Sequence, residues 1–291
     1  MGLFILCMTN RDYMNNSFLV VKPLKDHDGL LDEYIQLLKV LRNKGVILIE
    51  FSPVDNIESS KYLCTKNWIS FHGNGAVAVY PLSSLERQRE RNDSIFDVLE
   101  ENGFVVNDVV DFTEAEEEGV FLEGLGSVVI DTVNDVAYAS ISKKCDEELF
   151  IEFCEDLEYT PIVFSSEYQD GRIVEDTSSM LSISENFAII ASSLIKDKKE
   201  RKLVTLQLKK SGREVIYINE SQVSNHVAEI KQIRNESGDS FLILSKLMFD
   251  NLNKEQLEKL ESYGELLVVD YNTTEKFGNH SIGYSLNELY S

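Results

Sequence analysis

The stretch FLEGLGSVVIDTVNDVAYASISKKCDEELFIEFCEDLEYTPIVF, residues 121–164, decides the fold of this chain. A single unit with the order strand, strand, helix, strand cannot bury both faces of its sheet. The stretch therefore predicts an α/β protein in which several such units pack around a common axis. Its hydrophobic pattern predicts strands at 120–122, 127–131, 136–141 and 162–164 and a helix at 146–157.

The same order of elements recurs along the rest of the sequence, at intervals of roughly fifty residues. Gly73 and Gly75 flank Asn74 and favour a tight hairpin turn. Asp28 and Gly45 are suited to cap a helix at 30–42. The remaining predictions are strands at 3–8, 46–51, 68–71, 76–80, 104–110, 214–218, 241–244, 266–270 and 282–289 and helices at 84–102, 194–210 and 248–263. Periodicity alone leaves the number of units open.

The composition is that of one folded globular domain. Hydrophobic residues make up 43% and charged residues 27% of the chain, which is a balance typical of folded proteins. Only four prolines occur, and no low-complexity tract interrupts the pattern. We therefore expect a single domain over residues 1–291.

The formal net charge of −22 is the most unusual bulk property. Such a surface repels nucleic-acid phosphates and anionic lipids, so we expect neither nucleic acid nor membrane as a partner. The acidic run at 114–118 is typical of a solvated loop or helical turn, with a docking site for a basic partner as the alternative. The apolar run at 3–8 is too short for a signal peptide or a membrane span, so we expect a cytoplasmic protein.

The cysteines and histidines show no pattern typical of a metal site. Cys7 and Cys64 are isolated, and Cys145 and Cys154 are nine residues apart, which matches no common zinc spacing. No two histidines have ligand spacing. We therefore expect no metal and no cofactor.

Two stretches match the pattern of a known family. The first is NWISFH at 67–72, which continues to YPL at 80–82 and ERQRER at 86–91. The second is FLEGLGS at 121–127, which continues to AYASIS at 137–142. Together they resemble the amidinotransferase-like, arginine-deiminase-related hydrolases of the pentein superfamily. The resemblance implies a five-bladed α/β propeller, in which ββαβ units surround a pseudo-fivefold axis.

The resemblance also implies what an active site should contain. Members of the family attack a guanidinium carbon with a cysteine thiolate near the C-terminus, use a histidine as general acid and base, and hold the guanidinium with carboxylates. Here Glu123 matches one carboxylate, but the other three positions fall on Lys61, Asp176 and Tyr284. No cysteine follows Cys154, so the C-terminal thiol is absent.

Further binding candidates lie in or beside the matched segments. They are Asn67, Trp68 and His280. A relocated pair of Cys64 and His280 is conceivable, and the alternative is that Cys64 fills an apolar slot. For Glu123, both a role in ligand binding and a structural role at a strand end remain open.

The other charged and titratable residues are interpreted as structural. We predict a supporting role for His72 and surface or supporting positions for His27 and His226. The alternating charges at 86–91 predict a solvated, self-paired helix face. The lysine-rich helix predicted at 194–210 is expected to pair with acidic neighbours.

Lys61 leads to a structural hypothesis. A lysine stem is long enough to place its ammonium where a guanidinium would bind, paired with Glu123, Asp176 or both. The alternative is that Lys61 points to solvent.

Three functions fit these observations. The first is a catalytically inactive or strongly diverged homologue with a binding or regulatory role, directed at a protein or a small guanidino or amino-acid-like ligand. The second is an active hydrolase of a guanidino compound or amide that uses non-standard residues. The third is a structural subunit of an assembly, including a homo-oligomer. The missing C-terminal thiol favours the first.

Overall fold

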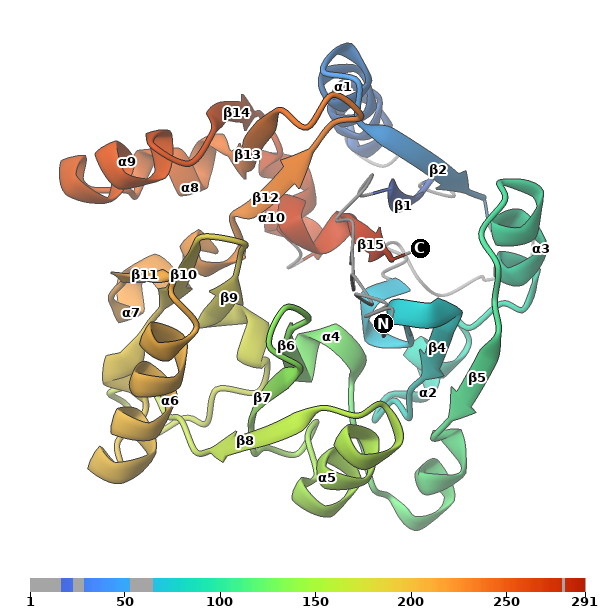
Figure 1. The fold of residues 1–291 in the computed structure, drawn as a ribbon, viewed down its shortest axis with the longest axis vertical. Coiled ribbons are helices and arrows are strands. Elements are labelled where there is room, and N and C mark those ends of the chain that lie inside the picture. Colours follow the sequence, from blue (N-terminus) through green and yellow to red (C-terminus); the bar gives the residue numbers. More distant parts are fainter. Residues whose placement is uncertain (1–16, 23–28, 53–64, 279–280, 291) are drawn as a thin grey trace, which may run out of the picture.

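Five small sheets surround one axis in the computed structural model, which describes residues 17–22, 29–52, 65–278 and 281–290 (Figure 1). In each sheet the middle strand pairs with an antiparallel strand on one side and a parallel strand on the other. A helix connects the middle strand to the parallel one, as a parallel pair requires. The predicted propeller of ββαβ units is therefore confirmed.

Each sheet has three strands, here given from the antiparallel strand through the middle one to the parallel one. The sheets are β15 (Asn287–Leu289), β1 (Ser17–Val21) and β2 (Ile47–Phe51); β3 (Ile69–Phe71), β4 (Ala76–Val79) and β5 (Asp108–Asp111); β6 (Val128–Asp131), β7 (Val136–Ser140) and β8 (Thr160–Phe164); β9 (Leu181–Ile183), β10 (Phe187–Ile190) and β11 (Glu214–Tyr217); and β12 (Lys231–Arg234), β13 (Ser240–Ser245) and β14 (Glu265–Val269).

The longer connecting helices, such as α1, α3, α5, α6 and α9, lie outside the ring of sheets (Figure 1). The starts of α5, α6 and α9 are set by side chains that accept hydrogen bonds from the first free N–H groups. Asp146 caps α5 and Asp197 caps α6, and Asn253 and Gln256 form a capping box on α9. The connecting helices are α1 (Leu30–Asn43), α2 (Leu85–Gln88), α3 (Ser94–Glu101), α5 (Glu147–Asp156), α6 (Lys198–Lys210), α8 (Lys246–Asp250) and α9 (Lys254–Glu261).

The first unit is built from both ends of the described chain. β15 pairs antiparallel with β1, with Leu289 opposite Ser17, and β1 pairs parallel with β2. This pairing closes the ring, as predicted. The sequence analysis missed β1, and its predicted strand at 3–8 lies outside the described residues.

Three predicted helices are wrong in extent, because polar capping residues interrupt them. The helix expected at 84–102 is two helices, and the Asn92 side chain accepts from Ser94 at the start of the second. The helix expected at 248–263 also divides, at the Asn253 cap. The helix expected at 194–210 begins only after the Asp197 cap. The amphipathic spacing of the sequence continues across these breaks, whereas the helical conformation of the backbone ends at each of them.

Three predicted strands also differ. The strand expected at 104–110 begins at Asp108. The segment at 120–122 is not a strand, and Leu122 forms only an isolated bridge to Cys145. The strand expected at 282–289 is a helical turn followed by β15.

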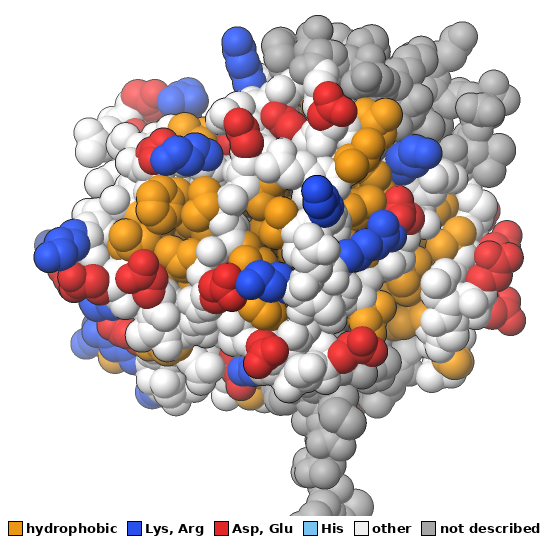
Figure 2. Space-filling view, turned by 90° about the horizontal axis from the view of Figure 1, so that it is seen from above, with side chains coloured by type: hydrophobic (Ala, Val, Ile, Leu, Met, Phe, Trp, Pro, Cys, Tyr) orange, Lys and Arg blue, Asp and Glu red, His pale blue; other side chains and the backbone are white. Residues whose placement is uncertain are grey.

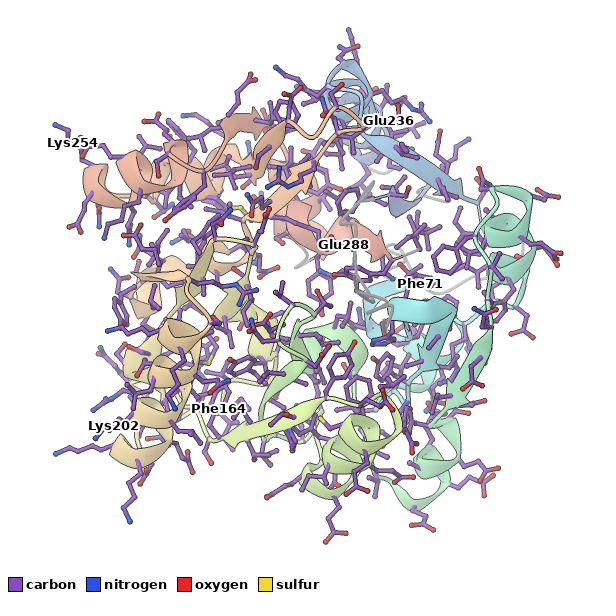
Figure 3. The ribbon with its side chains drawn as sticks, in the orientation of Figure 1. Phe71, Phe164, Lys202, Glu236, Lys254 and Glu288 are labelled. Atoms are coloured by element: carbon purple, nitrogen blue, oxygen red, sulfur yellow. The ribbon has the colours of Figure 1, made fainter. Side chains whose placement is uncertain are left out.

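The apolar core lies between the sheets and their helices rather than in one central mass. It forms separate clusters of buried residues. Trp68 is 3% exposed and packs with Leu19 and Phe51 between the first two units. Phe164 lies out toward the helices, whereas Phe71 and Glu288 lie near the axis (Figure 3). Both apolar and polar side chains therefore lie near the axis.

Two charged surfaces differ from expectation. Arg87 and Arg91 are each only 21% exposed, and Glu90 is 4% exposed, so these three residues are not solvated as predicted, although Arg87 pairs with Glu90 at 3.8 Å as the predicted self-pairing requires. Arg91 instead pairs with Glu116, at 2.5 and 2.8 Å. No lysine of α6 lies within ion-pair distance of a described carboxylate, and Lys202 extends outward (Figure 3). Hydrogen bonds from the backbone of α6 lower the pKa of Asp197 at the start of the helix, and the charges of Lys199 and Arg201 act in the same direction, so the expected pairing with acidic neighbours is limited to Asp197. On the face of the molecule shown in Figure 2, acidic, basic and apolar side chains are interspersed.

Candidate ligand site at the axis

Five short helical turns form a closed ring around the axis. Each turn comes directly before the first strand of its unit, so the repeat places them at equivalent positions. Each turn contacts the next in the order η1, α4, η4, η6 and η7, and η7 contacts η1. The turns are η1 (Thr65–Asn67), α4 (Gly124–Ser127), η4 (Thr177–Ser179), η6 (Val227–Glu229) and η7 (Ile282–Ser285).

The ring brings together residues that lie far apart in the sequence. A Cβ atom added to Gly126 would lie 2.2 Å from the Tyr284 hydroxyl, 3.1 Å from the end of the Asn67 amide and 3.3 Å from Asp176 Oδ1. These side chains therefore meet over α4, where only glycine leaves room for them. Glu123 is the residue before α4, so four of the predicted site residues gather here.

Gly124 explains the first glycine of the LEGLGS motif. Its φ of +47° lies in the left-handed region, which glycine adopts without steric cost. A Cβ at this position would lie 2.4 Å from the Lys66 carbonyl oxygen. The motif thus has a backbone role in seating α4 against η1.

Glu123 is 1% exposed and serves two roles at once. Its Oε1 accepts from the backbone N–H of Ser83 at 3.2 Å and from the Ser83 hydroxyl at 2.5 Å. Its Oε2 accepts no hydrogen bond within the described residues, but lies 3.7 Å from both Lys144 Nζ and Arg87 Nη1. One oxygen is structural, and the other faces the cations of the site.

Asp176 faces the same lysine. Lys144 Nζ donates to Asp176 at 3.3 Å for Oδ1 and 3.2 Å for Oδ2. Burial raises the pKa of Asp176, and the positive charge of Lys144 partly offsets this effect. About a third of the Asp176 side chain, 35%, remains exposed, so solvent reaches the site from this side.

Tyr284 stands in the C-terminal turn of the ring and is bound to Asn67. The Asn67 amide lies between the Tyr284 hydroxyl and the Arg87 guanidinium. Because a guanidinium can only donate, the amide oxygen faces Arg87, 3.2 Å from Nη2, and the amide nitrogen donates to Tyr284 at 2.5 Å. Lys66 lies beside them, with Nζ 5.1 Å from the centre of the Tyr284 ring and donating to the Gly283 carbonyl.

The fourth turn carries residues that the sequence analysis did not assign to the site. His226 Nδ1 lies 2.9 Å from Glu229 Oε1, and Ser281 donates to the other Glu229 oxygen at 2.5 Å. Burial alone would lower the pKa of His226, but the hydrogen bond and charge of Glu229 outweigh it and raise the pKa. Position in the repeat was the available signal, because His226 and Glu229 directly precede a first strand. Lys144 was also not predicted as a site residue, although it lies two residues after the matched AYASIS segment.

A cavity of about 210 Å³ lies along the axis next to this ring. Residues of β6, β9 and β12 line it, together with Lys66 and Tyr284. The charged side chains on its wall are paired, as in Lys231 with Glu288 at 2.8 Å. The cavity therefore carries little net charge.

His72 belongs to a buried network and not to the ring. Its Nε2 lies 2.6 Å from the Ser70 hydroxyl, which in turn lies 2.6 Å from the Tyr80 hydroxyl, and its Nδ1 lies 2.9 Å from the Tyr159 hydroxyl. Burial lowers the pKa of His72 to about 3, so its imidazole is neutral. The predicted structural role is confirmed.

Several predicted residues cannot be placed. Lys61, Cys64, His27 and His280 lie outside the described residues, as does the hypothesis that Lys61 fills the site. Within the described ranges no group of three histidine, cysteine or carboxylate side chains is arranged to hold a metal ion. None of the helices in the described part of the chain is long and apolar enough to cross a bilayer.

The chain resembles known proteins over nearly its whole length. A family model described as N,N dimethylarginine dimethylhydrolase, eukaryotic, matches residues 12–289. The chain belongs to this family. A comparison with curated protein sequences gives no match.

Solved structures with the same fold are also similar to this chain. The N-terminal domain of ArgZ, an arginine dihydrolase from cyanobacteria, aligns with a TM-score of 0.73 at 12% identity, over 95% of this chain and 99% of that one. A dimethylarginine dimethylaminohydrolase adduct aligns with a TM-score of 0.64 at 12% identity, over 95% and 100%. Unliganded AgrE gives 0.72 at 14% identity, over 94% of this chain. The chain spans 40% of the longer ArgZ chain and 39% of AgrE. These similarities place the family member in the pentein propeller fold.

Proposed function

We propose that this family member binds a small guanidino or amino-acid-like ligand at the axial ring without turning it over, and that its role is binding or regulation. The observation that carries the proposal is Tyr284. It occupies the C-terminal turn of the ring, where the family resemblance implies a cysteine, and its hydroxyl is bound to the Asn67 amide.

A phenol is a poor replacement for a thiol at this position. Phenols ordinarily titrate near ~10 and thiols near ~8.5, and a thiolate adds far more readily to a guanidinium carbon. The histidine that would act as acid and base is replaced by Asp176. Neither exchange supplies the missing chemistry.

The described cysteines offer no substitute nucleophile. Cys145 is 0% and Cys154 1% exposed. Burial raises the pKa of each thiol to about 12. Both are therefore neutral thiols in the core at physiological pH.

The polar groups of the ring support binding of a ligand with both charges. Glu123 and Asp176 provide negative charge, and Lys144 and Arg87 provide positive charge. An amino acid with a cationic side chain carries the complementary groups.

The test is a turnover assay with the purified full chain. Arginine, N,N-dimethylarginine and citrulline are incubated with micromolar protein, and citrulline, ornithine and ammonia are measured, with an active arginine dihydrolase as the positive control. We expect no product above the protein-free blank. Turnover that is lost in Glu123→Gln would contradict the proposal. A thiol-directed guanidine-type inactivator followed by mass spectrometry then tests Cys64, since an adduct there would indicate a relocated nucleophile.

A further inference from the structure

Lys144 occupies the position between two carboxylates that belong to different units. Its Nζ lies 3.2 Å from Asp176 Oδ2 and 3.7 Å from Glu123 Oε2. Glu175 Oε2 also lies 3.7 Å from Lys144 Nζ. Arg87 also reaches Glu123, but its guanidinium is held by the Asn67 amide and lies near Glu90. Lys144 is thus the described cation that contacts both Glu123 and Asp176.

The backbone holds Lys144 at this place. Its carbonyl oxygen accepts from the Glu123 N–H at 2.9 Å and from the Ser127 hydroxyl at 2.9 Å. Its own N–H donates to the Ser142 hydroxyl at 3.1 Å. Because these bonds attach it to both ends of α4, the ammonium is directed at the carboxylates by the same turn that positions Glu123.

The preceding lysine shows that this position is specific. Lys143 is 72% exposed and pairs with Glu175 Oε1 at 2.7 Å, away from Glu123 and Asp176. Lys144, by contrast, is 21% exposed. Both lysines pair with Glu175, but Lys144 is the more buried of the two and alone lies within ion-pair distance of Glu123 and Asp176.

We infer that Lys144 is an internal ligand that fills the cation position of the axial site. This inference rests on the proposed binding function and adds its regulation. A second cation placed between Glu123 and Asp176 would lie next to the Lys144 ammonium, which already donates to Asp176, and the two like charges would repel each other. An external ammonium or guanidinium must therefore displace the Lys144 ammonium, and the exposed side of Asp176 gives it access.

The inference predicts a gain of binding when the lysine side chain is removed. Lys144→Ala keeps the carboxylates of Glu123 and Asp176 and removes the four-carbon side chain of the lysine. The cations n-butylammonium and N-butylguanidinium carry a four-carbon chain of the same length and can take its place. Thermal shift and titration calorimetry with these two probes should show binding to Lys144→Ala at least about tenfold tighter than to wild type, because only ligand that binds the folded state stabilises it. Lys143→Ala is the matched control and should behave like wild type. Lys144→Arg should also behave like wild type, because it retains an internal cation.

Equal binding of the probes by wild type and Lys144→Ala would overturn the inference, and so would an equal gain in Lys143→Ala. Binding retained in Lys144→Ala/Glu123→Gln would show that the probes bind elsewhere, with the same consequence. These results are independent of the turnover assay, which tests the proposed function separately.

A measurement on the wild-type chain covers the case in which Lys144→Ala does not fold. Reductive methylation followed by peptide mass spectrometry should modify Lys143 at least about tenfold faster than Lys144, since the reaction needs a free, accessible amine. Glu123→Gln should accelerate modification of Lys144 and leave Lys143 unchanged. Equal rates at the two lysines in wild type would refute the internal-ligand assignment.

Discussion

Glu275 in α10 (Asn272–Gly278) is a buried carboxyl group whose replacement should make the protein less sensitive to pH. It is 6% exposed, and neither oxygen has a hydrogen-bond partner in the described part of the chain. Burial, together with the charges of Glu229 and Glu33, raises its pKa to about 7, although the neighbouring Ser245 hydroxyl and the charge of His226 act in the opposite direction. The folded state therefore favours the protonated acid.

The sign of the effect follows from proton linkage. The unfolded chain loses this proton near the ordinary pKa of 4.5, and the folded chain near 7. Stability from this group is thus greatest at low pH and falls as pH rises between these two values. The 2.5-unit difference corresponds to about 3 kcal/mol at pH 8, of which about 2.5 kcal/mol is lost between pH 5 and pH 8.

Urea unfolding of wild type and Glu275→Gln at pH 5 and pH 8 measures this difference. The variant should gain about 2.5 kcal/mol relative to wild type on going from pH 5 to pH 8. Any constant cost of burying the amide cancels in this comparison. The Glu275→Gln variant should retain a smaller pH dependence from His226, whose raised pKa acts in the same direction.

Glu33→Gln is the matched control. Glu33 is 8% exposed and accepts from Thr273 N at 2.6 Å and from Thr274 N and Oγ1 at 2.8 Å. Replacement of the Glu33 carboxylate by an amide should therefore destabilise the protein at both pH values. A Glu275→Gln variant with the same pH dependence as wild type would refute the reasoning, because the carboxyl group would then ionise normally in the folded state.

Two further predictions concern the links between units. Arg213→Met should reduce the free energy of unfolding, measured in urea, by about 3–5 kcal/mol, because Arg213 is 3% exposed and binds Asp131 at 2.6 and 2.8 Å. The double variant Asp131→Asn/Arg213→Met should recover part of this loss. No recovery would contradict a pairing role. Gly126→Ala should lower the melting temperature, since its Cβ would lie 2.2 Å from the Tyr284 hydroxyl, at a cost of about 1–3 kcal/mol. Gly126→Ala/Tyr284→Phe should restore part of that loss, and strictly additive effects would show that the clash is elsewhere.

The repeat was predictable because it is local. Hydrophobic spacing and turn residues near Gly73 and at 121–164 indicate strands and helices within one unit, and the same order recurs in the others. Pairing of β15 with β1 follows once five units must close a ring. The errors lie where capping residues such as Asn253 divide a continuous amphipathic pattern, because capping depends on backbone geometry and not on periodicity.

The site was predictable only in part. Matched motifs placed Asn67, Glu123, Asp176 and Tyr284 at the axis, and the ring brings all four together. Trp68 was named with them but packs in the core. Lys144 and Arg87 were not named, because no sequence rule says which neighbouring cation turns inward. Lys143 and Lys144 show this most clearly, since their local sequence is nearly the same.

The repeat of ββαβ units and the lack of a cysteine at 155–291 could be read directly from the sequence. Both are properties of residue order, since strand periodicity and residue identity need no tertiary contact. Only the tertiary structure decided which cation faces Glu123 and Asp176. That choice depends on hydrogen bonds from Glu123 and Ser127 to the Lys144 carbonyl within one unit, and on Asp176, which the packing of the next unit brings beside the Lys144 ammonium. The axial site is therefore a product of closure, and its occupant is a lysine that the motifs do not mark.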